Sequence, residues 1–163
     1  MGSGEKILEQ RKQEFEELSK IKDWRKILSN FYIQPFIFDG LTWNSVEHLY
    51  QGSKFKKNHP EFYKLFSIES GSDISKNPEM AKSAGGKSGK YKGKQLRPKN
   101  IIMDDDFFND DNKIMFRALY AKFSQNKDLL DVLKKTRDAK LIHFMRGNPY
   151  MTMTDLMKVR QIL

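Results

Sequence analysis

The segment from Ser45 to Phe55 has the pattern of a short helix with two different faces. Ser45 is a favourable N-cap residue, and Glu47 follows in the first turn, where the helix dipole favours negative charge. Two sets of residues recur at helical spacing: an apolar face with Val46, Leu49, Tyr50 and Ser53, and a polar face with Glu47, Gln51 and Lys54. The fold must therefore bury the first face and keep an acid, an amide and a cation in line on the second.

The residues that precede this helix are rich in aromatic side chains: Phe31, Tyr32, Phe36, Phe38 and Trp43. Asp39-Gly40 is a turn sequence, which predicts a hairpin between strands at 36–38 and 41–43. A carboxylate framed by aromatic rings is partly desolvated, which raises its pKa and suits it to proton transfer or to stabilising a cationic transition state. The alternative is an ordinary surface helix whose polar face serves solubility alone.

The rest of the chain predicts one compact α+β domain that is mostly helical, with a small β-sheet. Residues 1–24 are expected to form an N-terminal helical extension, with a charged helix from Glu5 to about Lys22, and residues 25–163 to form the domain. Asp110 or Asp111 is expected to cap a helix that runs over about 112–124. The further helices are expected at about 60–66, 78–84, 112–124, 128–135 and 154–163, with a strand at 141–144.

The composition excludes several classes of site. The 163 residues include no cysteine, which removes disulfides and thiolate metal sites and fits a reducing compartment, so we expect a cytoplasmic protein. The three histidines, His48, His59 and His143, are far apart in the sequence, and we expect neither a metal site nor a cofactor. No apolar run approaches the roughly 20 residues of a membrane span, so a membrane partner is not expected.

The formal net charge of +9 favours an anionic partner, and the charge is concentrated between Lys87 and Lys99. This stretch carries the cations Lys87, Lys90, Lys92, Lys94, Arg97 and Lys99, with Gly89 and Gly93 among them. Glycine permits close approach of the backbone, and the cations neutralise phosphate. A nucleotide, a phosphate ester or a nucleic acid would suit the segment, and the alternative is a mobile, solvated loop.

Several strings together resemble the YbiA-like family, also called NADAR, over roughly residues 28 to 144. They are Leu28-Ser29-Asn30-Phe31-Tyr32 with Pro35-Phe36, Asp39 to Trp43, Ser45 to Phe55, Pro78 to Gly85, Leu96-Arg97-Pro98 and Arg117 to Asn126. The resemblance implies a compact α+β fold and an N-glycosidase that acts on a ribose phosphate. Members that resemble riboflavin-pathway enzymes carry an acid and a tryptophan where this chain has 145–150, so an ADP-ribose or NAD-type substrate is favoured here, including ADP-ribose attached to guanine.

By this resemblance Glu47 matches the family's active-site glutamate, and it is the candidate catalytic residue. The candidate substrate-binding residues are Asn30, Phe31, Trp43, Gln51, Lys54, Lys82, Lys87, Arg97, Arg146 and Asn148. The expected partner is a phosphorylated nucleotide or an ADP-ribose-type ligand, which includes ADP-ribosylated nucleic acid. Two alternatives stay open: a non-catalytic module that binds ADP-ribose or a nucleotide, and a nucleic-acid binding protein that uses the basic loop.

Overall fold

The computed structural model describes residues 5–6, 13–144, 146–147 and 149–163. The helices within these ranges include α1 (Glu16–Ser19), α2 (Trp24–Leu28), α3 (Val46–Ser53), α4 (Pro60–Leu65), the 3-10 helix η2 (Ile68–Ser70), α5 (Asp73–Lys76), α6 (Pro78–Gly85), α7 (Phe107–Gln125), α8 (Lys127–Lys135) and α9 (Thr154–Ile162). The strands are β1 (Glu5–Lys6), β2 (Phe36–Phe38), β3 (Leu41–Trp43), β4 (Lys90–Tyr91), β5 (Lys94–Gln95), β6 (Ile142–His143) and β7 (Met151–Thr152).

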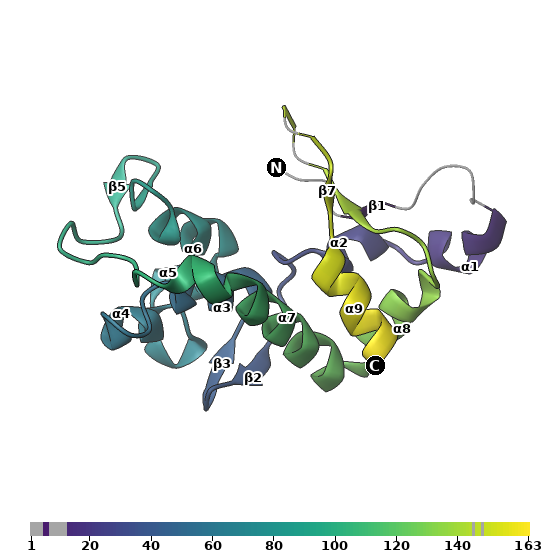
Figure 1. Ribbon diagram of the computed structural model, residues 1–163, viewed down its shortest axis with the longest axis horizontal. Coiled ribbons are helices and arrows are strands. Elements are labelled where there is room, and N and C mark those ends of the chain that lie inside the picture. The colour runs from purple at the N-terminus through teal and green to yellow at the C-terminus, as the bar shows by residue number, and fades with distance from the viewer. Residues whose placement is uncertain (1–4, 7–12, 145, 148) are drawn as a thin grey trace.

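Helix α7 runs across the molecule and joins its two ends (Figure 1). On one side α7 packs against α3, which also contacts α6, and on the other side it packs against α9 and α8. The strands form small antiparallel sheets in the orders β1-β6-β7, β2-β3 and β4-β5. The predicted α+β class, mostly helical with little sheet, is confirmed.

The core is continuous through α3 and α7. Trp43, Phe36, Phe55, Phe66 and Phe123 are among its largest fully buried side chains. Phe55, Phe62 and Phe66 form an aromatic cluster in which Phe62 meets the other two rings edge to face. This packing covers the apolar face of α3, as its helical spacing predicts.

The β2–β3 hairpin has the turn that its sequence predicts. Asp39 and Gly40 adopt φ angles of 56° and 70°, the left-handed conformation that a tight hairpin turn requires. At the middle of β2, the side chain of Gln125 accepts a hydrogen bond from the Ile37 N–H and donates one to its carbonyl, both at 2.7 Å. On β3, Glu69 accepts from the Thr42 N–H at 2.8 Å. These contacts tie the hairpin to α7 and η2.

Two sequence expectations about helix boundaries are wrong. Glu5 and Lys6 form a strand that pairs with β6, so the expected N-terminal helix does not begin at Glu5. Helix α7 begins at Phe107, five residues before the expected start, because the buried Phe107 ring anchors its first turn. Asp110 and Asp111 consequently lie inside the helix and do not cap it. The division of the chain at residue 24 stays a prediction, although Phe15 and Leu18 are buried in the same core as α3.

Within the residues that the structure describes, no helix is both long enough and apolar enough to span a membrane.

Candidate active site

The start of α3 is fixed by a buried hydrogen-bond chain. Ser45 accepts from the His48 N–H at 3.2 Å, which confirms the predicted N-cap. His48 is fully buried, and its Nε2 lies 2.8 Å from the Ile74 carbonyl. Because a carbonyl only accepts, Nε2 carries the proton, and Nδ1 accepts from the Ser45 hydroxyl at 2.7 Å. Burial lowers the pKa of His48 to about 4, so the ring is neutral and structural.

Glu47 lies on the first turn of α3 and is only 7% exposed. Its backbone N–H donates to the Asn30 carbonyl at 3.0 Å, and its Oε1 accepts from Gln51 Nε2 at 2.8 Å. Burial raises the pKa of the Glu47 carboxyl, and the Gln51 hydrogen bond and the charges of Lys82 and Lys54 oppose that rise. The predicted desolvation of this carboxylate is therefore confirmed.

The charges of two lysines from different segments act on the Glu47 carboxyl. Lys54, just after α3, donates from Nζ to the Gly85 carbonyl at 3.0 Å, and burial lowers its pKa. Lys82, on α6, is exposed, and its Nζ lies 5.8 Å from the centroid of the Phe31 ring. The site therefore offers positive charge beside a single buried carboxylate, an arrangement suited to a phosphorylated ligand.

Gln51, through its side chain, and Asn30, through its backbone carbonyl, are hydrogen-bonded to Glu47, and both carry side-chain amides. Asn30 Nδ2 contacts the Met115 sulfur at 3.7 Å. Among the described residues, neither Asn30 Oδ1 nor Gln51 Oε1 has a hydrogen-bond partner, although both atoms are buried. A buried acceptor without a partner is costly, and a ligand hydroxyl or a water that donates to it removes the cost.

The structure brings titratable side chains of α7 and β6 toward Tyr50 of α3 and Lys82 of α6, which sequence reasoning did not predict. Tyr50 donates to Asp111 Oδ2 at 3.1 Å, and burial, with the charges of Asp111 and Glu47, raises the pKa of the Tyr50 hydroxyl. Burial also raises the pKa of Asp155. The charge of Lys158 opposes this rise, and the charge of Asp111 adds to it. Burial, with the charge of Lys82, lowers the pKa of His143. In the sequence, only the helical spacing of Asp111 with Met115 and Ala118 indicates that Asp111 lies on the face of its helix that points toward α3.

Trp43 is a core residue, and its expected role in lining the site stays a prediction. Its side chain is fully buried, its Nε1 donates to the Phe38 carbonyl at 2.9 Å, and its ring lies 5.1 Å from that of Tyr63. An aromatic residue near a catalytic helix has the same sequence pattern whether it faces the core or a ligand.

Lys87 and Arg97 lie at a second place, the base of the β4–β5 hairpin. They line a cavity of about 300 Å³ together with Ser88, Gln95, Pro98, Lys99, Ile101, Ile102 and Met103. Glu47 is not among its lining residues. The Arg97 guanidinium donates to backbone carbonyls at the end of α6, which sequence reasoning did not anticipate. The phosphate-binding roles of Lys87 and Arg97 stay predictions.

The remaining expected site residues belong to the loop between β6 and β7. Arg146 is exposed in a turn with Gly147, whose φ is 82°. Asn148 lies outside the described residues. Both ligand roles, and the pocket expected around Glu47, stay predictions.

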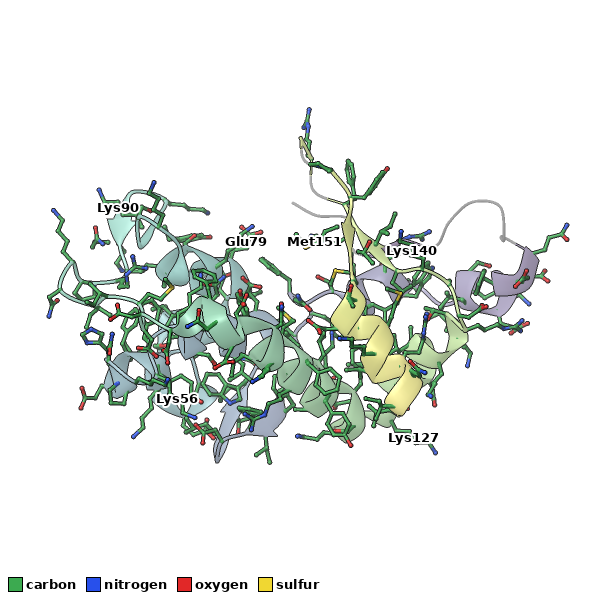
Figure 2. The ribbon with its side chains drawn as sticks, viewed as in Figure 1. Lys56, Glu79, Lys90, Lys127, Lys140 and Met151 are labelled. Atoms are coloured by element: carbon green, nitrogen blue, oxygen red, sulfur yellow. The ribbon has the colours of Figure 1, made fainter. Side chains whose placement is uncertain are left out.

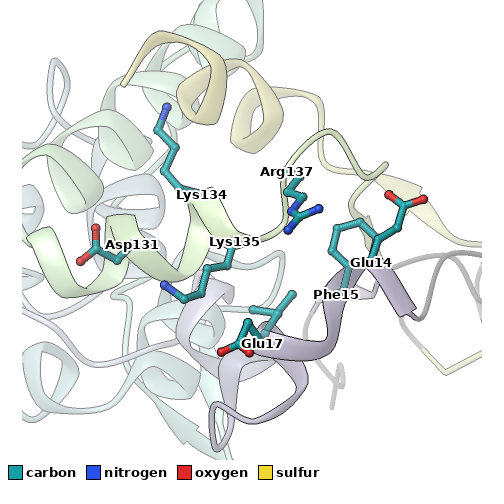
Figure 3. A pocket seen from close by; sticks show the side chains of 8 residues that line it. Glu14, Phe15, Glu17, Asp131, Lys134, Lys135 and Arg137 are labelled. Carbon is teal, nitrogen blue, oxygen red and sulfur yellow. The ribbon is translucent and has the colours of Figure 1, made fainter.

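A further cavity, of about 280 Å³, lies where α1 meets α8 (Figure 3). Its lining residues are Glu14, Phe15, Glu17, Leu18, Asp131, Lys134, Lys135 and Arg137. Every charged side chain in this set is exposed, so the cavity contains no desolvated acid of the kind found at Glu47. Among the described residues there is also no group of three or more His, Cys, Asp or Glu side chains that could hold a metal ion.

Comparison with known proteins shows which family the chain belongs to. Residues 11–150 match the NADAR domain. The N-glycosidases YbiA of Escherichia coli K12 and of Shigella flexneri are each 31% identical to this chain over 124 residues, which cover 75% of this chain and 64% of theirs. The NMR structure of E. coli YbiA has the same fold, with a TM-score of 0.60 and 24% identity over 88% of this chain and 80% of that one. The chain thus spans somewhat less than two thirds of the curated relatives, and it belongs to the NADAR domain family.

Proposed function

We propose that the chain hydrolyses an N-glycosidic bond to a ribose phosphate. The observation that carries this proposal is the buried Glu47 carboxylate, which Gln51 holds by a hydrogen bond and which faces the charges of Lys54 and Lys82. Breaking an N-glycosidic bond builds positive charge on the sugar, and a preorganised carboxylate stabilises that charge and takes a proton from water. The relatives named N-glycosidase support the same reaction type. Water is the only co-substrate, so no cofactor is required.

The proposed substrate is of the ADP-ribose or NAD type, including ADP-ribosyl-guanine. Lys54 and Lys82 supply cations from two helices, which suits a phosphate attached to the ribose. The unpartnered side-chain Oδ1 of Asn30 suits a ribose hydroxyl. A cytoplasmic location is part of the proposal and rests on the cysteine-free sequence, which suits a reducing compartment.

A second candidate function is nucleic-acid binding by the β4–β5 hairpin. Lys87, Lys90, Lys92, Lys94 and Lys99 are exposed, and no salt bridge engages them in the part of the chain that the structure describes. Figure 2 shows Lys90 at the far end of the molecule from α9. An ADP-ribosylated nucleic acid is a polyanion, and its backbone would lie along the lysines of this hairpin.

The test is incubation of the chain with NAD, with ADP-ribose conjugates and with ADP-ribosylated DNA, followed by mass spectrometry. Release of a free base and of a ribose phosphate product from any of them supports the proposed hydrolase. Tight binding of ADP-ribose with no release at any pH would identify a non-catalytic binding module. If the chain neither releases a base from these compounds nor binds them, both functions proposed for the Glu47 site are contradicted.

A further inference from the structure

Gly85, the last residue of α6, lies directly against the Gln51 side chain. A Cβ atom at this position would lie 2.9 Å from Gln51 Cβ and 3.0 Å from its Cδ, and closer still to Oε1. Gly85 does not have a positive φ, so backbone conformation does not require glycine here. The requirement is space, because the Gln51 amide occupies the position that a side chain on Gly85 would fill.

The same residue also contacts the second neighbour of Glu47. The Gly85 carbonyl accepts a hydrogen bond from Lys54 Nζ at 3.0 Å. Gln51 in turn donates to Glu47 Oε1 at 2.8 Å, and the Lys54 charge acts on the Glu47 carboxyl. One glycine therefore fixes both the amide and one of the cations that surround Glu47.

Arg97 fastens this end of α6 from the base of the β4–β5 hairpin. Its Nη1 donates to the carbonyls of Ala84 at 2.5 Å and Gly86 at 2.7 Å, and its Nη2 donates to the Lys87 carbonyl at 3.2 Å. The last carbonyls of a helix have no partner within the helix, and a guanidinium fork satisfies several of them at once. Gly89, with φ of 68°, leaves room for Arg97, since a Cβ there would lie 2.9 Å from Arg97 Cβ.

We propose that Gly85 and Arg97 are positioning residues of the Glu47 site, which act through Gln51 and Lys54. Arg97 holds the end of α6 in place, and the bare Cα of Gly85 lets α6 approach α3 closely enough for Gln51 to reach Glu47. Only the kinetic part of this inference rests on the proposed hydrolase activity. The contribution of the hairpin to the site is thus the fork of Arg97 at its base, rather than the lysines along its strands.

The first test measures the pKa of Glu47 directly, by carbon-13 NMR of its side-chain carboxyl, and needs no turnover. Gly85→Ala displaces the Gln51 amide, so the carboxylate loses a hydrogen bond and its pKa rises. In a Gln51→Ala background most of that rise disappears, because the displaced group is already absent. The charged and titratable groups around Glu47, namely Lys54, Lys82 and Tyr50, are unchanged in all of these variants.

Gly86→Ala is the matched control. A Cβ at Gly86 meets the Lys82 carbonyl oxygen at 3.2 Å and does not approach Gln51, so the pKa of Glu47 should stay as in wild type. No shift in Gly85→Ala, or a shift of equal size with and without Gln51, would overturn the role of Gly85. Should Gly85→Ala alone fail to fold, folding of the Gly85→Ala/Gln51→Ala double variant would support the same close contact, and failure of both would count against it.

The second test separates positioning by Arg97 from phosphate binding. Arg97→Met is expected to lower kcat and to raise the pKa of Glu47, whereas Lys64→Met, an exposed lysine of α4, should change neither. A residue that only held the phosphate would raise KM and leave the pKa of Glu47 untouched. That second result would overturn the positioning role. If no substrate is hydrolysed, the NMR titration of Arg97→Met still decides between the two roles, so the inference can fail independently of the proposed function.

Discussion

Helix α3 and the β4–β5 hairpin are the two regions where the sequence places charge that could meet a ligand, and the structure treats them in opposite ways. The polar face of α3 is packed: Glu47 and Gln51 are each 7% exposed, and Lys54 is half-buried. The lysines of the hairpin are exposed and form no salt bridge among the described residues. The most highly charged segment of the chain is therefore not the one that contains the buried carboxylate. Burial is the better guide to a reactive group, because a desolvated group has its pKa altered by the fold.

The largest expected difference between the two regions is in turnover. Glu47→Gln should lower the turnover number by at least about 10²–10⁴-fold, the usual contribution of a positioned acid or base. Glutamine keeps the size of the side chain, so ligand affinity should stay within about tenfold, or ~1.4 kcal/mol. Single-turnover release of free base and calorimetric binding measure the two quantities. Equal release by wild type and variant would show that Glu47 is not the catalytic group.

A smaller difference is expected in substrate binding. Lys54→Ala should raise KM by about 10- to 100-fold, which corresponds to the roughly 1.5–3 kcal/mol of a hydrogen bond to a charged group. The turnover number should change less, because the phosphate does not react. With an ADP-ribose substrate that is not attached to nucleic acid, Lys94→Ala, an exposed lysine of the hairpin, is the matched control and should leave KM within about twofold of wild type. If the two variants raised KM equally, the distinction between buried and exposed cations would be lost.

The hairpin should matter only for long anions. Replacing Lys90, Lys92 and Lys94 together with alanine should reduce the salt dependence of DNA or RNA binding, with the slope of log K against log salt smaller by about 2–3. Binding of ADP-ribose should not change. Filter binding or fluorescence anisotropy over a range of salt concentrations gives the slope. An unchanged slope would remove nucleic-acid binding from the functions of this hairpin.

The smallest expected effect is on stability. Burial raises the pKa of Glu47 in the folded chain above its unfolded value, so its contribution to stability is greatest below the unfolded pKa and is lost as the pH rises through the folded pKa. Glu47→Gln should therefore melt at a higher temperature than wild type at pH 7, and the difference should shrink as the pH falls toward about 4.

Thermal melts at several pH values test this expectation, and Glu61→Gln is the control. Glu61 also lies in the first turn of a helix, α4, but it is exposed, so its replacement should give no stabilisation. A Glu47→Gln variant that was less stable than wild type at pH 7 would mean that the helix dipole and the Gln51 hydrogen bond outweigh desolvation.

Local patterns were enough to predict the helix that carries the site. The N-cap at Ser45, the spacing of Glu47 and Gln51, and the hairpin turn at Asp39 all depend on neighbours within a few residues, and all have the expected form. The acidic pair in the first turns of α7 misled for the same reason. Asp110 and Asp111 suit a helix cap by composition, and only the burial of Phe107 shows that the helix has already begun.

Long-range contacts account for what the sequence did not predict. Asp111, on α7, accepts a hydrogen bond from Tyr50 of α3, and Asp155, on α9, interacts with Asp111, although both acids are far from α3 in sequence. Arg97 lies in a basic segment typical of phosphate binding, yet its guanidinium donates to backbone carbonyls at the end of α6. Trp43 was expected at the site because aromatic residues gather there, and it packs in the core. No pattern within one segment distinguishes these outcomes.

The side chains that border the β2–β3 hairpin have a consequence for association between molecules. Two short strands leave a row of backbone groups on each outer edge, and such edges recruit strands from other chains. Here the Gln125 amide occupies both backbone groups of Ile37 on one edge, and Glu69 occupies the Thr42 N–H on the other. Ile37 itself is 62% exposed, so an apolar residue stands at a place where self-association would otherwise begin. These two side chains act as built-in blocks against aggregation through this ribbon.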